Sequence, residues 1–306
     1  MSGGSGSTPV TGFSGRTVDE HCRQAPAEPL RRYVAWYTGY RQRGVPPARH
    51  RGLPSPFLTL IFTLDEPVTL LAHPDPGQPP AEYDALLGGL HRAPALIVHQ
   101  GAQSGIQVAL RPLGARALLG LPAGELADID VPAEDVLGGA CAELRARIVP
   151  AACWPERFEI LDEILLRLAA ARWTGSGPGV ATDVAPEVSW AWQRLLRSGG
   201  AMRVSALAAE TGWSGRHLTG RFRTEIGLTP KAAARVIRFS RARRLLVGQI
   251  AQASETTLAD LAVTCGYFDQ AHLAREFRAL AGCPPSQWLA EEFRNVQAGA
   301  WLHEAT

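Results

Sequence analysis

A long hydrophobic run is missing from this chain: among its 306 residues no stretch of about 18 apolar residues occurs, so we expect no membrane-spanning helix. Met1–Gly15 also lacks the basic and apolar regions of a secretory signal, and its glycines and serines predict a flexible tail. Residues 296–306 are expected to form a second tail. The sequence therefore favours a cytoplasmic protein.

Closely spaced cysteines are absent too. The five cysteines lie far apart, and none has the Cys-x-x-Cys spacing of zinc and redox sites. An odd, scattered set argues against a disulfide framework and is typical of a reducing compartment. The sequence also lacks a GxSxG elbow, a Walker loop and a GxGxxG motif. We therefore expect no cofactor and no enzymatic activity.

The composition does support a packed core, with 46% hydrophobic and 20% charged residues. The length favours two domains, and the Gly- and Pro-rich segment Thr174–Pro186 predicts a linker between them. Charge is unevenly spread, because Glu187–Arg294 holds 15 basic and nine acidic residues whereas the remainder is mildly acidic. This split favours a nucleic-acid-binding module beside a partner domain, although an ordinary solvated surface remains the alternative.

The C-terminal third contains an internal repeat. LAAETGWSGRHLTGRFRTEIGLTP begins at Leu207, and LAVTCGYFDQAHLAREFRALAGCPP begins at Leu261, with one residue inserted in the second turn. Each copy predicts a helix-turn-helix: a short helix, a turn glycine, a capped second helix and a terminating glycine. The predicted turn glycines are Gly212 and Gly266, the caps Ser214 and Asp269, and the terminating glycines Gly227 and Gly282.

The second helix of each copy carries arginine opposite its apolar face. Leu218 and Phe222 share one face in the first copy, and Leu273 and Phe277 share it in the second. Between the copies, Pro230–Gln249 predicts one helix about 30 Å long, close to the roughly 34 Å of one duplex turn. Two recognition helices in adjacent major grooves are therefore expected, and a bundle of helical hairpins is the alternative.

The stretch Glu187–Arg294 resembles the AraC/XylS family of bacterial transcription regulators. The resemblance rests on LAAETGWSGRHLTGRF, GLTPKAAARVIRFSRARRLL, TLADLAVTCGYFDQAHLAREF and GCPPSQW, and covers about a third of the chain. It implies seven helices and two recognition helices. The family's base-reading positions fall on Arg216, Thr219, Gly220, Gln270, Ala271 and Arg275. Gly220 and Ala271 depart from the pattern because they have no polar side-chain group that could hydrogen-bond to a base, although Ala271 can contact a thymine methyl group.

Further DNA contacts are expected around these positions. Arg223 and Arg278 lie on the arginine-bearing faces and complete the base-reading candidates. The phosphate-contact candidates are Ser214, His217, Lys231, Arg235, Arg244 and His272. Double-stranded DNA is thus the expected partner, and RNA polymerase is a further candidate.

The N-terminal domain has several strand-like runs, separated by Pro- and Gly-rich turns such as GVPPARHRGLPSP and HPDPGQPP. The runs are Tyr33–Tyr40, Phe57–Leu64, Val68–Ala72, Ala95–His99 and Gly105–Leu110. They favour a β-sandwich or small barrel. Helices are expected at 114–120, 139–148 and 155–173. The fold class is thus α+β: a cupin-like barrel or sandwich with helices, as the resemblance also implies, then an all-α tandem helix-turn-helix domain.

A pocket inside such a barrel would hold an unknown small-molecule effector. Its candidate lining residues are Trp36, Tyr37, Tyr40, His50, Arg51 and His99, although each of these types is more often packed or on the surface. The histidines lack the His-x-His spacing of metal-binding cupins, so no metal is expected. The cysteine spacing also disfavours the DNA-repair methyl-acceptor domain that is fused to some AraC-like proteins.

The helix over 155–173 has an apolar stripe at helical spacing, formed by Phe158, Leu161, Leu165 and Leu168. Packing onto the strands is the simpler interpretation, and a homodimer helix is the alternative. The expected domains are 16–173 for sensing and dimerisation and 187–295 for DNA binding. The chain is thus predicted to be a sequence-specific transcription regulator with a small-molecule effector. A non-catalytic ligand-binding protein, or an enzyme with a helical C-terminal bundle, is the alternative.

Overall fold

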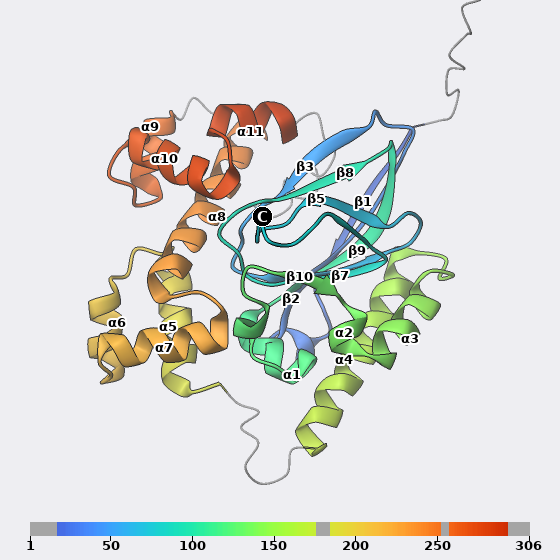
Figure 1. Ribbon diagram of the computed structural model, residues 1–306, viewed down its shortest axis with the longest axis horizontal. Coiled ribbons are helices and arrows are strands. Elements are labelled where there is room, and N and C mark those ends of the chain that lie inside the picture. Colours follow the sequence, from blue (N-terminus) through green and yellow to red (C-terminus); the bar gives the residue numbers. More distant parts are fainter. Residues whose placement is uncertain (1–16, 176–183, 252–256, 293–306) are drawn as a thin grey trace, which may run out of the picture.

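The computed structural model describes residues 17–175, 184–251 and 257–292. Strands and helices alternate with loops up to residue 175, and the part after residue 184 is helical (Figure 1). The predicted tails at 1–15 and 296–306, and most of the predicted linker, lie outside the described residues. The α+β fold class with two architecturally different halves is confirmed.

The N-terminal half contains two antiparallel sheets. The larger has the order β1-β2-β9-β4-β7-β10, and the smaller has the order β3-β8-β5-β6. The strands are β1 (Val18–Gln24), β2 (Val34–Arg43), β3 (Ala48–Gly52), β4 (Leu58–Thr63), β5 (Val68–Ala72), β6 (Ala81–Tyr83), β7 (Ala85–Gly88), β8 (Ala95–His99), β9 (Ala102–Leu110) and β10 (Asp130–Pro132). The five predicted runs correspond to β2, β4, β5, β8 and β9.

The turn predicted over GVPPARHRGLPSP is partly wrong, because β3 lies inside it. This strand pairs only with β8 at one edge of the smaller sheet, where His50 stands opposite Ile97. The prolines that made the segment resemble a turn flank the paired residues, so they remove no hydrogen bond from the ladder. The prediction failed because prolines on both sides of a short edge strand look the same as prolines within a loop.

The N-terminal half also contains helices, which lie between and after the strands. They are η1 (Glu28–Leu30), η2 (Pro112–Gly114), α1 (Ala115–Leu119), η3 (Ala123–Leu126), α2 (Glu134–Leu137), α3 (Gly139–Ile148) and α4 (Trp154–Gly175). Helix α4 covers one face of the larger sheet: the Tyr37 hydroxyl donates to Asp162 Oδ1 at 2.7 Å, and a Cβ at Gly39 would lie 2.3 Å from the Trp154 ring. Phe158 and Leu161 of the predicted stripe are fully buried, so the simpler packing interpretation describes this chain.

The C-terminal half contains seven helices within residues 184–251 and 257–292. They are α5 (Pro186–Arg197), α6 (Val204–Thr211), α7 (Gly215–Ile226), α8 (Pro230–Ala251), α9 (Leu258–Thr264), α10 (Gln270–Ala281) and α11 (Pro285–Glu292). The pairs α6–α7 and α9–α10 lie at the two ends of α8 (Figure 1). With 22 residues, α8 is about 33 Å long. None of the described helices is long and apolar enough to cross a membrane.

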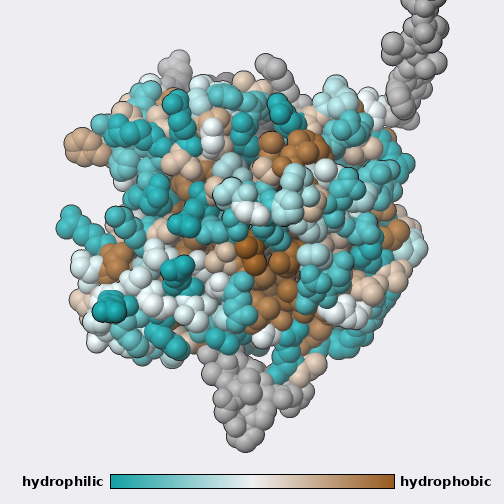
Figure 2. All heavy atoms as spheres, in the orientation of Figure 1, coloured by the Kyte–Doolittle hydropathy of each residue, from teal (hydrophilic) through white to brown (hydrophobic). Residues whose placement is uncertain are grey.

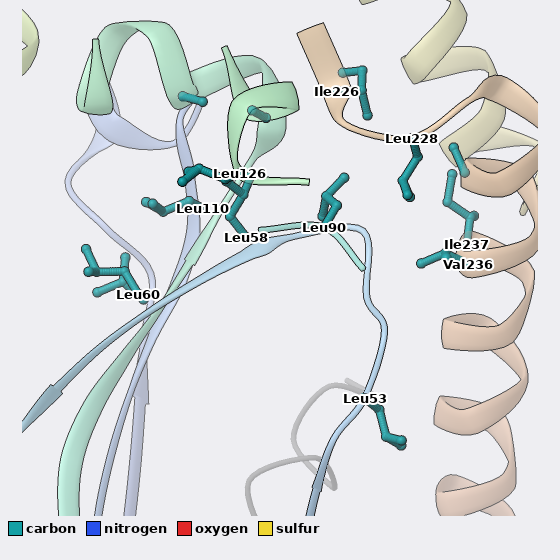
Figure 3. Packing of buried hydrophobic residues seen from close by; sticks show 14 of the residues in the cluster. Leu53, Leu58, Leu60, Leu90, Leu110, Leu126, Ile226, Leu228, Val236 and Ile237 are labelled. Atoms are coloured by element: carbon teal, nitrogen blue, oxygen red, sulfur yellow. The ribbon is translucent and has the colours of Figure 1, made fainter. Parts of the chain in front are cut away.

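The two halves share one apolar core. Its buried residues run from Leu30 in the sheet domain to Trp288 in α11. Figure 3 shows Leu90 of the N-terminal half facing Leu228 and Ile237 of the C-terminal half, with Leu126 beside Leu58 and Leu110 behind it. The outer surface in Figure 2 is mainly hydrophilic, and its most extended apolar area lies near the middle of the view. The halves are thus packed together through side chains that water does not reach.

Candidate nucleic-acid interface

Both helix-turn-helix units have the local structure that the repeat predicted. Gly212 and Gly266 adopt φ values of +71° and +77°, in the left-handed region that glycine enters without strain. The Ser214 side chain caps α7 by accepting from the His217 amide at 3.2 Å, and Asp269 caps α10 by accepting from the His272 amide at 2.6 Å. The predicted turns and caps are confirmed.

Helix α7 presents its predicted base-reading residues unevenly. Arg216, Gly220 and Arg223 are exposed, and Thr219 is half-buried, with its hydroxyl donating to the Gly215 carbonyl at 2.7 Å. Leu218 and Phe222 are fully buried on the other face, as predicted. The arginines of α7 thus lie in solvent, while Leu218 and Phe222 pack the opposite face of the helix into the core.

Helix α10 repeats the arrangement. Gln270, Ala271, Arg275 and Arg278 are all exposed, whereas Leu273 and Phe277 are buried. Helices α7 and α10 are each held to α8, so their exposed faces belong to one rigid unit. Which bases these side chains meet stays a prediction.

The residue inserted in the second turn is Phe268, and sequence reasoning did not single it out. It stands between Tyr267 and the cap Asp269, and 89% of it is exposed. Its amide donates to His272 Nδ1 at 3.3 Å, which fixes the turn. A large apolar side chain directly before a recognition helix is the signal that would have identified it.

The phosphate-contact candidates differ in their surroundings. Lys231 and His217 are exposed, and Ser214 serves as the cap described above. The Arg235 side chain instead donates to Glu276 Oε1 at 2.6 Å, which ties α8 to α10. Arg244 is exposed but lines a cavity between the halves, and the half-buried His272 packs its ring against Tyr267. Their contacts with phosphate stay predictions.

The N-terminal half lies against the C-terminal part of α7. A Cβ at Gly124 of η3 would come within 2.2 Å of the Thr224 carbonyl oxygen. Arg116 donates to both carboxylate oxygens of Glu225 at 2.7 and 2.9 Å, and this hydrogen bonding raises the Arg116 pKa. Gly220 and Arg223 line a small cavity with η3. The N-terminal half therefore adjoins one end of the predicted DNA-reading face.

A cavity of about 730 Å³ lies between the sheet domain and helices α5 and α8. Of the six predicted effector-pocket residues, Trp36 lines this cavity. Tyr37 faces α4 instead, and the side chain of Arg51 forms an ion pair with Glu291.

Tyr40, His50 and His99 complete the six and are buried in the N-terminal half, although they do not line the cavity. Burial raises the pKa of Tyr40, and burial beside His99 lowers the pKa of His50 to about 3. Both groups are thus neutral over a wide pH range. The sequence analysis missed the cationic wall of the cavity, and it interpreted one of the lining arginines, Arg244, as a phosphate contact.

Comparisons with known proteins agree with the local structure. Residues 207–291 match the helix-turn-helix domain family, and residues 23–132 match a domain of unknown function, DUF6597. No curated protein matches the chain. Among solved structures, ToxT from Vibrio cholerae is 13% identical, with 83% of this chain and 97% of that chain covered and a TM-score of 0.49.

A second ToxT structure, with bound unsaturated fatty acid, is 12% identical, covers 83% of this chain and 94% of that chain, and has a TM-score of 0.47. Because both TM-scores are below one half, neither likeness decides what this chain binds. The match over residues 207–291 stands independently of them. Residues 207–291 therefore form a helix-turn-helix domain, as the repeat predicted.

Proposed function

We propose that this chain is a sequence-specific, DNA-binding transcription regulator whose N-terminal half binds a small-molecule effector. The observation that carries the proposal is the pair of arginine-bearing helices α7 and α10 at the two ends of α8. The length of α8, about 33 Å, is close to one turn of B-DNA. This length supports the entry of the two proposed recognition helices into successive major grooves.

The residues divide into two roles in this proposal. Arg216 and Arg275 are the best guanine readers, because a guanidinium donates two parallel hydrogen bonds to the O6 and N7 atoms of guanine. Lys231 contacts a phosphate, which adds affinity for every sequence alike. An effector acts by binding more tightly to one arrangement of the halves than to another.

The remaining assignments follow from this function. The sensing domain is proposed to span residues 16–173, the linker 174–186 and the DNA-binding domain 187–295. The protein acts without catalysis in the cytoplasm and contacts RNA polymerase at its promoters. A homodimer would place two such units on repeated half-sites.

Fluorescence anisotropy with a labelled duplex from upstream of the protein's own gene tests the proposal. We expect Arg216→Ala and Arg275→Ala each to cost about 1–3 kcal/mol on the cognate duplex and to relax selectivity at different base pairs. Lys231→Ala should weaken binding to all duplexes alike and lower the salt slope by about one. Arg92→Ala, at an exposed arginine of the N-terminal half, is the matched control. Equal losses on a scrambled duplex would refute base reading by either arginine.

A further inference from the structure

The cavity between the halves combines a cationic wall with an aromatic one. Its arginines come from both halves: Arg23 from β1, Arg197 from α5, and Arg241, Arg243 and Arg244 from α8. No aspartate or glutamate stands among the lining residues that the structure describes. The cavity wall therefore carries a concentrated positive charge that favours an anionic occupant.

Other lining residues make part of the wall aromatic and aliphatic. The rings of Trp36 and Phe57 meet edge to face with centroids 4.6 Å apart. The Arg23 guanidinium lies 4.3 Å from the centroid of the Trp36 ring, so a cation and an aromatic surface adjoin. Ile237 and Leu245 add aliphatic surface from α8. This wall suits the body of an organic molecule rather than a bare inorganic ion.

The size and position of the cavity limit what can enter it. Its volume of about 730 Å³ lies within the range of ligand pockets, about 300–1,000 Å³. Arg243 is only 3% exposed, and Thr59 and Gln107 of the sheet stand across the cavity from α8. A cavity of this volume between the sheet and α8 fits a small molecule.

We propose that this cavity binds a small organic anion, in which a carboxylate or phosphate group lies on the arginines and a flat apolar body lies on Trp36 and Phe57. A guanidinium group can donate two parallel hydrogen bonds to a pair of oxygens in either anion. Because the walls come from both halves, the ligand contacts the sheet domain and α8 together. The inference deepens the proposed function, since it names the effector's chemical class and the site where it binds.

Isothermal titration calorimetry of the full-length protein without DNA tests the site. The probes are biphenyl-4-carboxylate and biphenyl-4-yl phosphate. Biphenyl-4-carboxamide is the control that has the aromatic rings but no charge, and acetate is the control that has the charge but no aromatic rings. We expect one of the two biphenyl anions to bind at least about tenfold more tightly than the amide and than acetate. The tighter of the two anions identifies the charged group. Equal affinity for anion and amide, or no binding of either biphenyl anion, would overturn the proposal.

Arg23→Gln and Arg241→Gln change the site from its two sides. Each should weaken binding of the preferred anion about tenfold and leave the weak binding of the amide unchanged, because only the charged contact is lost. Arg32→Gln, at an exposed arginine beside Tyr33, is the matched control and should bind as the wild type does. Using one arginine from each half keeps the test valid if one variant fails to fold. Unchanged anion affinity in both folded variants contradicts the assignment.

The readouts separate this proposal from the proposed function. If the anion binds but no duplex is recognised, the ligand site stands and the regulator function fails. If a cognate duplex is recognised but neither biphenyl anion binds, the regulator function stands and the ligand class is wrong.

Discussion

His50 is a buried histidine on a strand that the sequence did not reveal. Only 2% of it is exposed, and its ring centroid lies 6.3 Å from that of His99. Its two ring nitrogens have no hydrogen-bond partner within the described part of the chain. Burial and the neighbouring His99 disfavour the charged ring, which lowers its pKa from 6.5 to about 3.

The pH dependence of stability follows from this depressed pKa. Below pH 6.5 the unfolded chain takes up a proton that the folded His50 does not accept until about pH 3. The free energy of unfolding should therefore fall as the pH drops through this window, by up to about 1.4 kcal/mol per pH unit from this residue. His50→Gln should flatten that fall. Urea unfolding at several pH values measures it, and identical slopes for wild type and variant would contradict the prediction.

Phe268 is the second residue with an unusual position, because it is apolar and 89% exposed directly before α10. The adjoining Asp269 caps α10, the second recognition helix of the proposed function, whose first turn would meet base edges. Phe268 therefore lies where it can contact a thymine methyl group or a sugar.

Phe268→Ala should weaken binding to the cognate duplex about tenfold, since an apolar contact at the duplex is lost. The thermal stability should stay within about 1 kcal/mol of wild type, because the ring is exposed. Anisotropy titrations and thermal unfolding of the same preparation give both quantities. Val263→Ala, at another exposed apolar residue of this unit, is the control.

At the scale of elements, the contact between η3 and α7 bears most directly on DNA binding. The Gly124 backbone comes so close to α7 that no side chain fits between them, and Arg116 holds Glu225 at the same contact. Arg223 lines the cavity beside it. A duplex that engages the whole of α7 must therefore compete with η3.

Gly124→Val should separate η3 from α7 and raise the affinity for the cognate duplex. The added side chain would overlap the Thr224 carbonyl, so the contact must open. Arg116→Ala should act in the same direction and also lower stability by about 2 kcal/mol, because it leaves the buried Glu225 carboxylate without its arginine. Anisotropy titrations measure the affinities. Unchanged affinity in both variants would mean that η3 does not compete with DNA.

At the scale of the whole molecule, one hydrophobic core continues from the sheet domain into the helical half. Leu228 is 2% exposed and lies between Leu90 of the sheet domain and Ile237 of α8 (Figure 3). Separating the halves would expose these side chains to water at a cost proportional to their area. The helical half is thus stabilised by the sheet domain as well as by its own helices.

Urea unfolding should therefore follow one transition, coincident by tryptophan fluorescence and circular dichroism. Leu228→Ala should lower the free energy of unfolding by about 2–5 kcal/mol, because it leaves a cavity in the shared core. The same variant should also separate the urea midpoints measured by tryptophan fluorescence and by circular dichroism. Two separate transitions in the wild-type protein would show that the halves fold independently.

The sequence determined whatever depends on neighbours along the chain. Gly212 and Gly266 marked the turns, Ser214 and Asp269 marked the caps, and apolar spacing placed the buried face of each recognition helix. These features form through hydrogen bonds within a few residues, so their residue types identify them. The five main strand runs were likewise readable from their β-branched and aromatic residues.

Only the tertiary structure decided how distant segments meet. It assigned Arg241 and Arg244 to a cavity shared with Trp36, and it turned Tyr37 away from that cavity toward Asp162. It also placed Gly124 against α7. An arginine on a helix has the same sequence signature whether it meets a phosphate, a carboxylate or a ligand. Its role is fixed by what folds opposite it, and that depends on the packing of the two halves.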